Sequence, residues 1–118
     1  MAVVTYRDLD VWRVAMDLRE QVYGVSAMFP GDERFGLTSQ VRRASVSVPS
    51  NIAEGYGRIH RAEYIHHLSI ARGSLMEVET QLTLAARLKL TERESVLPLW
   101  DSCQRVGQML NKLIESLS

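Results

Sequence analysis

The chain has 118 residues, of which 46% are hydrophobic and 24% are charged, a balance that is typical of a globular protein and excludes a disordered or fibrous one. The formal net charge is zero, so no overall electrostatic field draws the chain toward nucleic acid or a membrane surface. No stretch approaches the ~20 apolar residues that a membrane-spanning helix needs, and the N-terminus lacks the apolar core of a signal peptide, so we expect a cytoplasmic protein with one domain over residues 1–118.

The first predicted helix runs from about Leu9 to Met28. Its apolar residues recur at alternating steps of four and three, a spacing that places them on one face of a helix. They are Val11, Ala15, Leu18, Val22, Val25 and Phe29. We expect the helix to end before Pro30, because proline disfavours helical geometry in the residue that precedes it.

A second helix is predicted to start near Leu37 and to end between Gly55 and Gly57. Its apolar row is Leu37, Val41, Ala44, Val48 and Ile52. Pro49 lies inside this row, where it removes a backbone donor and clashes with the preceding turn, so a kink is expected rather than an end. A polar stripe runs beside the apolar row and consists of Ser39, Arg43, Ser47, Asn51 and Glu54.

The third predicted helix runs from about Arg61 to Leu88. Its apolar stripe is Tyr64, Leu68, Ala71, Leu75, Val78, Leu82 and Ala85. Gly73 in the middle of this helix costs roughly 1 kcal/mol relative to alanine, which indicates that another backbone approaches closely there.

A capping box is expected to open the fourth helix, with Thr91 as N-cap and Glu94 three residues later. The apolar row of that helix is Val96, Leu99, Cys103, Val106, Leu110, Leu113 and Leu117.

Four such helices with mostly short connections predict an all-α fold, an antiparallel up-down-up-down four-helix bundle, because a short connection makes sequential helices antiparallel neighbours. Trp12, Tyr23 and Trp100 lie at amphipathic positions on different helices, so they are interpreted as core or subunit-contact residues rather than surfaces for stacking bases.

The sequence contains no recognisable catalytic motif. Bundles that hold two iron ions need Glu-x-x-His on two helices, and only Glu63 and His66 match that spacing. Gly55 and Gly57 lack the third glycine and the preceding strand of a dinucleotide site, and no P-loop or nucleophile elbow is present. We therefore expect no enzymatic activity, no catalytic residues, no cofactor and no metal site.

The arginines are concentrated in the middle of the chain. Residues 34–72 contain six arginines and two glutamates, a net charge of +4 that the rest of the chain balances. Arginine suits phosphate because its planar fork contacts two oxygens at once. The predicted nucleic-acid contacts are Arg42, Arg43, Arg58, Arg61 and Arg72. One subunit offers few cations, so the prediction depends on a homo-oligomer that repeats the patch.

The polar stripe of the second helix has two interpretations. It is either a solvated face, in which Glu54 pairs with Arg58 at the i,i+4 spacing, or a subunit interface. The predicted interface residues are Ser39, Ser47, Asn51 and Glu54, since the Asn51 amide can donate and accept hydrogen bonds across a contact. The alternative to nucleic-acid binding is therefore a structural adaptor whose stripe is used in subunit or protein-partner contacts.

Four segments of the chain resemble one known family. They are YRDLDVW at 6–12, FGLTSQVRRA at 35–44, SVPSNIAEGYGR at 47–58 and IARGSLMEVETQL at 70–82. They are similar to the bacterial four helix bundle protein family, which includes proteins encoded in intervening sequences of large-subunit ribosomal RNA genes. The resemblance implies a four-helix bundle that assembles into barrel-like pentamers.

A related protein, the accessory variability protein of diversity-generating retroelements, binds nucleic acid and its reverse transcriptase through a basic surface. The resemblance implies structural or nucleic-acid-facing positions at Arg42, Arg43, Arg58 and Arg72. It also makes a reverse transcriptase or another protein a candidate partner. The leading prediction is a noncatalytic homo-oligomer, expected to be a pentamer, that binds RNA or DNA and no membrane.

Overall fold

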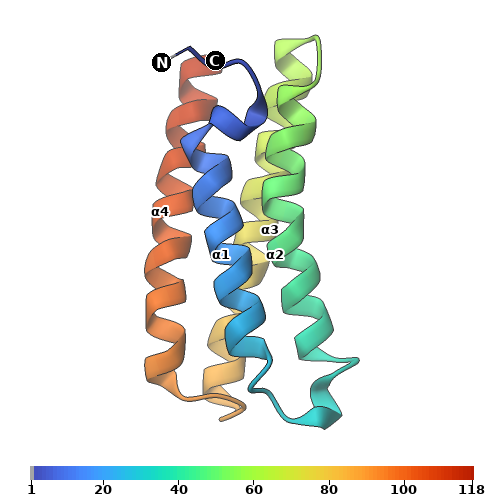
Figure 1. Cartoon of the computed structure of the whole chain (residues 1–118), viewed down its shortest axis with the longest axis vertical. Helices are drawn as coiled ribbons and strands as arrows, with labels where there is room; N and C mark the ends of the chain where they lie inside the picture. The colour runs from blue at the N-terminus through green and yellow to red at the C-terminus, as the bar shows by residue number, and fades with distance from the viewer. Residues whose placement is uncertain (1) are drawn as a thin grey trace.

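The structure is a computed structural model that describes residues 2–118 and contains four long helices and two short 3₁₀ helices (Figure 1). The elements are η1 (Tyr6–Asp8), α1 (Asp10–Ser26), η2 (Gly31–Glu33), α2 (Leu37–Tyr56), α3 (Arg61–Arg87) and α4 (Arg93–Leu117). No strand occurs in the described residues, so the predicted all-α fold is confirmed. In Figure 1 the colour runs down α1, up α2, down α3 and up α4, so successive helices point in opposite directions.

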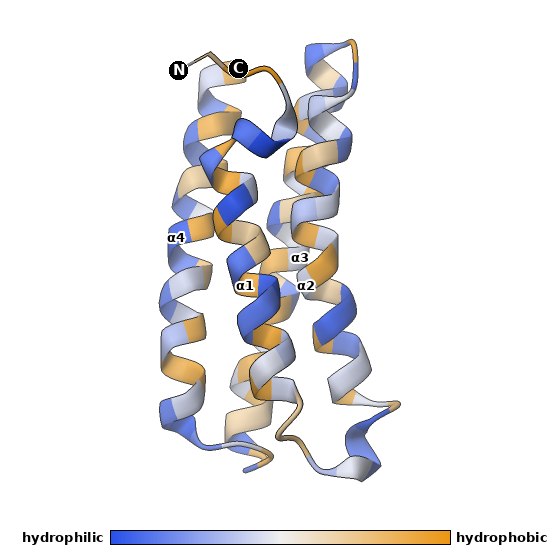
Figure 2. Cartoon of the chain, viewed as in Figure 1, coloured by the Kyte–Doolittle hydropathy of each residue, from blue (hydrophilic) through white to orange (hydrophobic). Residues whose placement is uncertain are grey.

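The core lies between all four helices. Each helix contacts the next one along the chain, and α4 also packs against α1, which closes the bundle. Figure 2 shows orange, hydrophobic residues on the faces of the helices that turn toward one another. Leu18, Ile52, Leu75 and Leu110, one from each helix, are completely buried, and burying a side chain of this size contributes about 1.5–3 kcal/mol. The apolar rows seen in the sequence therefore account for the packing.

The end of α1 differs slightly from the predicted end at Met28. The helix stops at Ser26, and the backbone N–H groups of Met28 and Phe29 donate to the carbonyls of Val25 and Ser26 in tight turns. These turns bring Phe29 back against the core, where it is buried. Helix α2, by contrast, continues through Pro49.

The predicted capping box at Thr91 is wrong. Helix α4 begins at Arg93 with Glu92 as its N-cap, and no side chain caps it. The cause lies at the end of α3, where Lys89 adopts a left-handed conformation with φ of 60° and the Leu90 N–H donates to the Ala85 carbonyl at 2.9 Å. This is a Schellman turn without glycine, in which the Lys89 N–H also donates to the Ala86 carbonyl at 3.1 Å.

The prediction that another backbone approaches closely at Gly73 is also wrong. A Cβ atom added at Gly73 would meet nothing within 4 Å, because this residue faces solvent. At Gly55 of α2 an added Cβ would lie 2.8 Å from the Cβ of His67 and 3.1 Å from a ring carbon of Tyr64. The tightest α2–α3 contact at a glycine is therefore near the end of α2. None of the helices within residues 2–118 has an apolar stretch of the length needed to cross a bilayer.

Candidate nucleic-acid interface

Two members of the predicted interface stripe join α2 to α3 within the subunit. The Ser47 and Ser74 hydroxyl oxygens lie 2.8 Å apart. The Asn51 side-chain N–H₂ donates to the Ser47 carbonyl at 2.9 Å and to the Ser47 hydroxyl at 3.0 Å, and its oxygen lies 3.1 Å from Nδ1 of His67. Because these groups are half-buried, the bonds satisfy polar atoms that water does not fully reach.

Two of the predicted phosphate-binding arginines also have partners in the same subunit. Arg58 donates to the Glu54 carboxylate at 3.2 Å, the i,i+4 pair expected for a solvated face, and both side chains are about half exposed. Such a pair contributes only a few tenths of a kcal/mol. Arg72 donates to the side-chain oxygen of Asn111 at 2.8 Å and so connects α3 to α4.

Arg42 holds α2 against the end of α1. Its Nε donates to the Ser26 hydroxyl at 2.8 Å, and its Nη2 donates to the Tyr23 carbonyl at 3.3 Å. The guanidinium carbon lies 4.7 Å from the centre of the Tyr23 ring, a cation–π distance. A cation is favourable here because the last carbonyls of a helix carry partial negative charge.

The remaining two predicted arginines, Arg43 and Arg61, are exposed, and no carboxylate of residues 2–118 lies within 4.0 Å of either. Arg43 lies in α2, whereas Arg61 is the first residue of α3. The stretch of α2 from Arg43 to its end at Tyr56 alone spans roughly 20 Å at 1.5 Å per residue. A single subunit therefore does not gather the five arginines into one patch.

A different group of arginines does meet in one place. Arg34, Arg42 and Arg43 line a shallow hollow of about 410 Å³ where the η2–α2 connection passes the end of α1. The other lining residues are Tyr23, Phe35, Thr38 and Ser39. We call this site the arginine hollow. None of its lining residues is acidic, so the charged side chains that line it are all positive.

The loop geometry explains why Arg34 and Phe35 point outward. The Glu33 carboxylate accepts the backbone N–H of Leu37 at 3.1 Å, which places it at the N-terminus of α2 and away from the hollow's lining. Leu37 is buried behind this bond, so the two residues between Glu33 and Gly36 project to solvent. Arg34 lies in the cationic segment of the sequence, but neither Arg34 nor Phe35 is among the predicted site residues. An aromatic next to an arginine, just before a helix, was the available signal.

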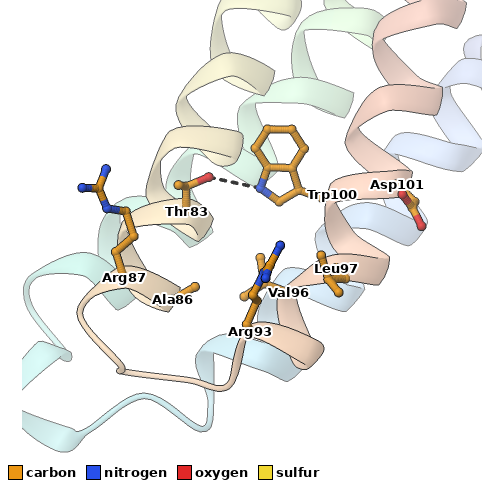
Figure 3. A pocket seen from close by; sticks show the side chains of 8 residues that line it. All are labelled: Thr83, Ala86, Arg87, Arg93, Val96, Leu97, Trp100 and Asp101. Atoms are coloured by element: carbon orange, nitrogen blue, oxygen red, sulfur yellow. Dashed lines mark hydrogen bonds between the residues drawn. The ribbon is translucent and has the colours of Figure 1, made fainter.

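A second surface feature lies between α3 and α4, near their connection (Figure 3). We call it the α3–α4 groove, and it has a volume of about 470 Å³. Its lining residues are Thr83, Ala86, Arg87, Arg93, Val96, Leu97, Trp100 and Asp101. Trp100 Nε1 donates to the Thr83 hydroxyl at 3.1 Å, which fixes the indole of α4 against α3. Leu97, which also belongs to α4, is 48% exposed. The groove therefore offers apolar surface with charges at its rim.

The groups that could do chemistry are few. Burial raises the pKa of the Cys103 thiol from 9.0 to about 12, which keeps it protonated and unreactive. In the part of the chain that the structure describes, no three histidine, cysteine or acidic side chains converge as metal ligands would.

Comparisons with known proteins bear on the fold and the family. The sequence model of the family described as 23S rRNA-intervening sequence protein matches residues 7–112. The chain is similar to a crystal structure from Bacteroides thetaiotaomicron, of a protein with unknown function from the S23 ribosomal protein family, with a TM-score of 0.82 and 22% identity. That similarity covers 88% of this chain and 97% of the other, so it extends over the bundle. No curated protein matches the chain.

Proposed function

This chain belongs to the 23S rRNA-intervening sequence protein family, and we propose that it is a noncatalytic protein that binds RNA or DNA. We propose further that it acts as a homo-oligomer, and the resemblance implies a pentamer. The observation that carries the proposal is the arginine hollow. Three arginines line it and none of the lining residues is acidic, so a phosphate bound there would meet only positive charges among the lining side chains.

Arg43 is the residue best suited to contact phosphate in this hollow. It is exposed, and no carboxylate within residues 2–118 forms an ion pair with it. Arg42 contributes charge from a fixed position, because two of its nitrogens are already bonded to Ser26 and Tyr23. One such site binds weakly, and an oligomer that repeats it gains affinity through multiple simultaneous contacts.

The apolar surface of the α3–α4 groove supports assembly. Leu97 is exposed in the groove, and Met76 and Leu84 are exposed in a hollow that adjoins it and shares Trp100. A contiguous apolar surface with a charged rim is typical of a protein contact. We therefore assign the subunit contact to this surface rather than to Ser47 and Asn51, whose polar groups are bonded within the chain.

The proposal is tested by two measurements on the purified full chain. Light scattering is expected to give a multiple of the 13.4 kDa subunit mass. Gel-shift titration with a structured RNA, repeated at increasing salt, is expected to show affinity that falls as salt rises, because bound phosphates release counterions. A monomer in solution contradicts the assembly half of the proposal, and an absence of binding at low salt contradicts the nucleic-acid half.

A further inference from the structure

We propose that the arginine hollow binds unpaired nucleotides, with a base stacked on the Phe35 ring and the neighbouring phosphate held by Arg43. This inference rests on the proposed function and narrows it, from nucleic acid in general to single-stranded nucleic acid. It assigns a role to Phe35 and Arg34, which the cationic pattern of the sequence did not select.

The first support is the position of the Phe35 ring. Its residue is 89% exposed, although an aromatic side chain of this size is among those that gain most from burial. The guanidinium carbon of Arg34 lies 5.3 Å from the ring centre, and the rest of the ring surface is open to solvent. An open aromatic face accepts any base by stacking, because every base has a π face.

The second support is what surrounds the ring. Single exposed apolar residues are common and need no explanation. Ile59, in the α2–α3 connection, is 93% exposed and lines none of the hollows described above. Phe35 differs because it shares a hollow with three arginines and with the hydroxyl-bearing Thr38 and Ser39. Proteins that bind single-stranded nucleic acid combine aromatic side chains, on which the bases stack, with cationic side chains that contact the phosphate backbone.

The third support is that part of the site is fixed before a ligand arrives. The Arg42 guanidinium is held by hydrogen bonds to the Ser26 hydroxyl and the Tyr23 carbonyl. The position of its remaining N–H groups is therefore fixed. Fixing a donor in advance lowers the conformational entropy lost on binding. Arg43 has no such anchor, so its guanidinium N–H groups are available to a phosphate.

The stacking of bases in a duplex favours a single strand as the ligand of the hollow. In a duplex the bases stack on one another, so only phosphates are available to the hollow. Phe35 then has no partner, and the single strand is the preferred ligand.

Fluorescence anisotropy tests this with a labelled single-stranded RNA of mixed sequence and the same strand annealed to its complement, at one low salt concentration. Wild-type protein is expected to bind the single strand more tightly than the duplex. Phe35→Ala is expected to weaken single-strand binding about five- to a hundredfold and to leave duplex binding unchanged. Phe35→Trp restores the stack and the affinity, whereas Phe35→Leu does not.

Ile59→Ala is the matched control, since it also truncates a highly exposed apolar residue, and its affinities are expected to equal those of the wild type. Light scattering on each variant shows whether assembly is retained. Equal affinity of Phe35→Ala and wild type for the single strand overturns the inference and leaves the proposed function standing. Dissociation of the Phe35→Ala oligomer also overturns it, because Phe35 is then a subunit contact. If wild type binds neither RNA, the proposed function itself fails.

Discussion

Arg42 Nε donates a hydrogen bond of 2.8 Å to the hydroxyl of Ser26, which lies at the end of the preceding helix and is almost completely buried. The arginine and the serine therefore fasten α2 to α1, and the same guanidinium forms part of the arginine hollow. One residue thus links the stability of the bundle to the charge of its candidate binding site. Its neighbour Arg43 has no comparable role in the fold.

Arg42→Ala is expected to lower the free energy of unfolding by about 1–3 kcal/mol, because the buried Ser26 hydroxyl loses a charged donor. Arg43→Ala, the matched control on the adjacent residue, is expected to change it by less than about 0.5 kcal/mol, as exposed substitutions do. Urea unfolding followed by circular dichroism measures both values. Equal losses in the two variants would show that the Ser26 bond does not stabilise the bundle.

Asn51→Ala is expected to destabilise the subunit by about 1–3 kcal/mol, since Nδ1 of the half-buried His67 loses its hydrogen-bond partner, while the Ser47 hydroxyl keeps its bond to Ser74. Ser50→Ala is a suitable control, because Ser50 is an exposed residue of the same helix. Urea titration measures both variants, and light scattering at a temperature well below unfolding measures their assembly. If Asn51→Ala dissociates the oligomer while its stability is unchanged, the stripe is a subunit interface and the adaptor alternative gains support.

Gly55→Ala and Gly73→Ala form a matched pair with opposite expected effects. An added Cβ at Gly55 collides with His67, and relieving such a collision costs typically 1–3 kcal/mol. At Gly73 the new methyl group meets nothing, and alanine favours the helix by up to ~1 kcal/mol. Thermal unfolding should give a lower midpoint for the first variant and a higher one for the second. The reverse order would contradict the packing of α2 on α3.

Leu97→Arg is expected to dissociate the oligomer, because it places a charge in the apolar part of the α3–α4 groove where we assign the subunit contact. Gln108→Arg adds the same charge to an exposed position of α4 outside the groove and should leave the mass unchanged. Light scattering over a range of protein concentrations compares the two. Retention of the oligomer by Leu97→Arg would remove the groove from the interface.

The helices could be predicted from the sequence because their information is local. The apolar rows that include Leu18 and Leu75 follow the helical period, and both residues are buried as that period requires. The start of α4 could not be predicted, because Lys89 adopts a left-handed conformation that usually marks a glycine. Charge and turn composition gave no other sign of that turn.

The candidate site was less accessible to sequence reasoning because its contacts are not local. Arg42 meets Ser26 across sixteen positions, and Arg72 meets Asn111 across thirty-nine. Two arginines of the cationic segment therefore form separate inter-helix contacts. Phe35 lies in the arginine hollow because the Glu33 carboxylate accepts the Leu37 N–H at the start of α2, and the η2–α2 connection then projects to solvent. The composition of the segment does not predict this geometry.

Phosphate binding by the arginine hollow is tested by the salt dependence of RNA binding by wild type and by Arg43→Gln, with Arg105→Gln as a control that removes an exposed charge from α4. If repeated arginine hollows bind phosphate, the logarithm of the wild-type association constant falls linearly with the logarithm of salt concentration. Arg43→Gln is then expected to make that slope shallower by about 1 for each subunit in contact with the RNA, and Arg105→Gln to leave it unchanged. A slope that is the same for wild type and Arg43→Gln would contradict the account.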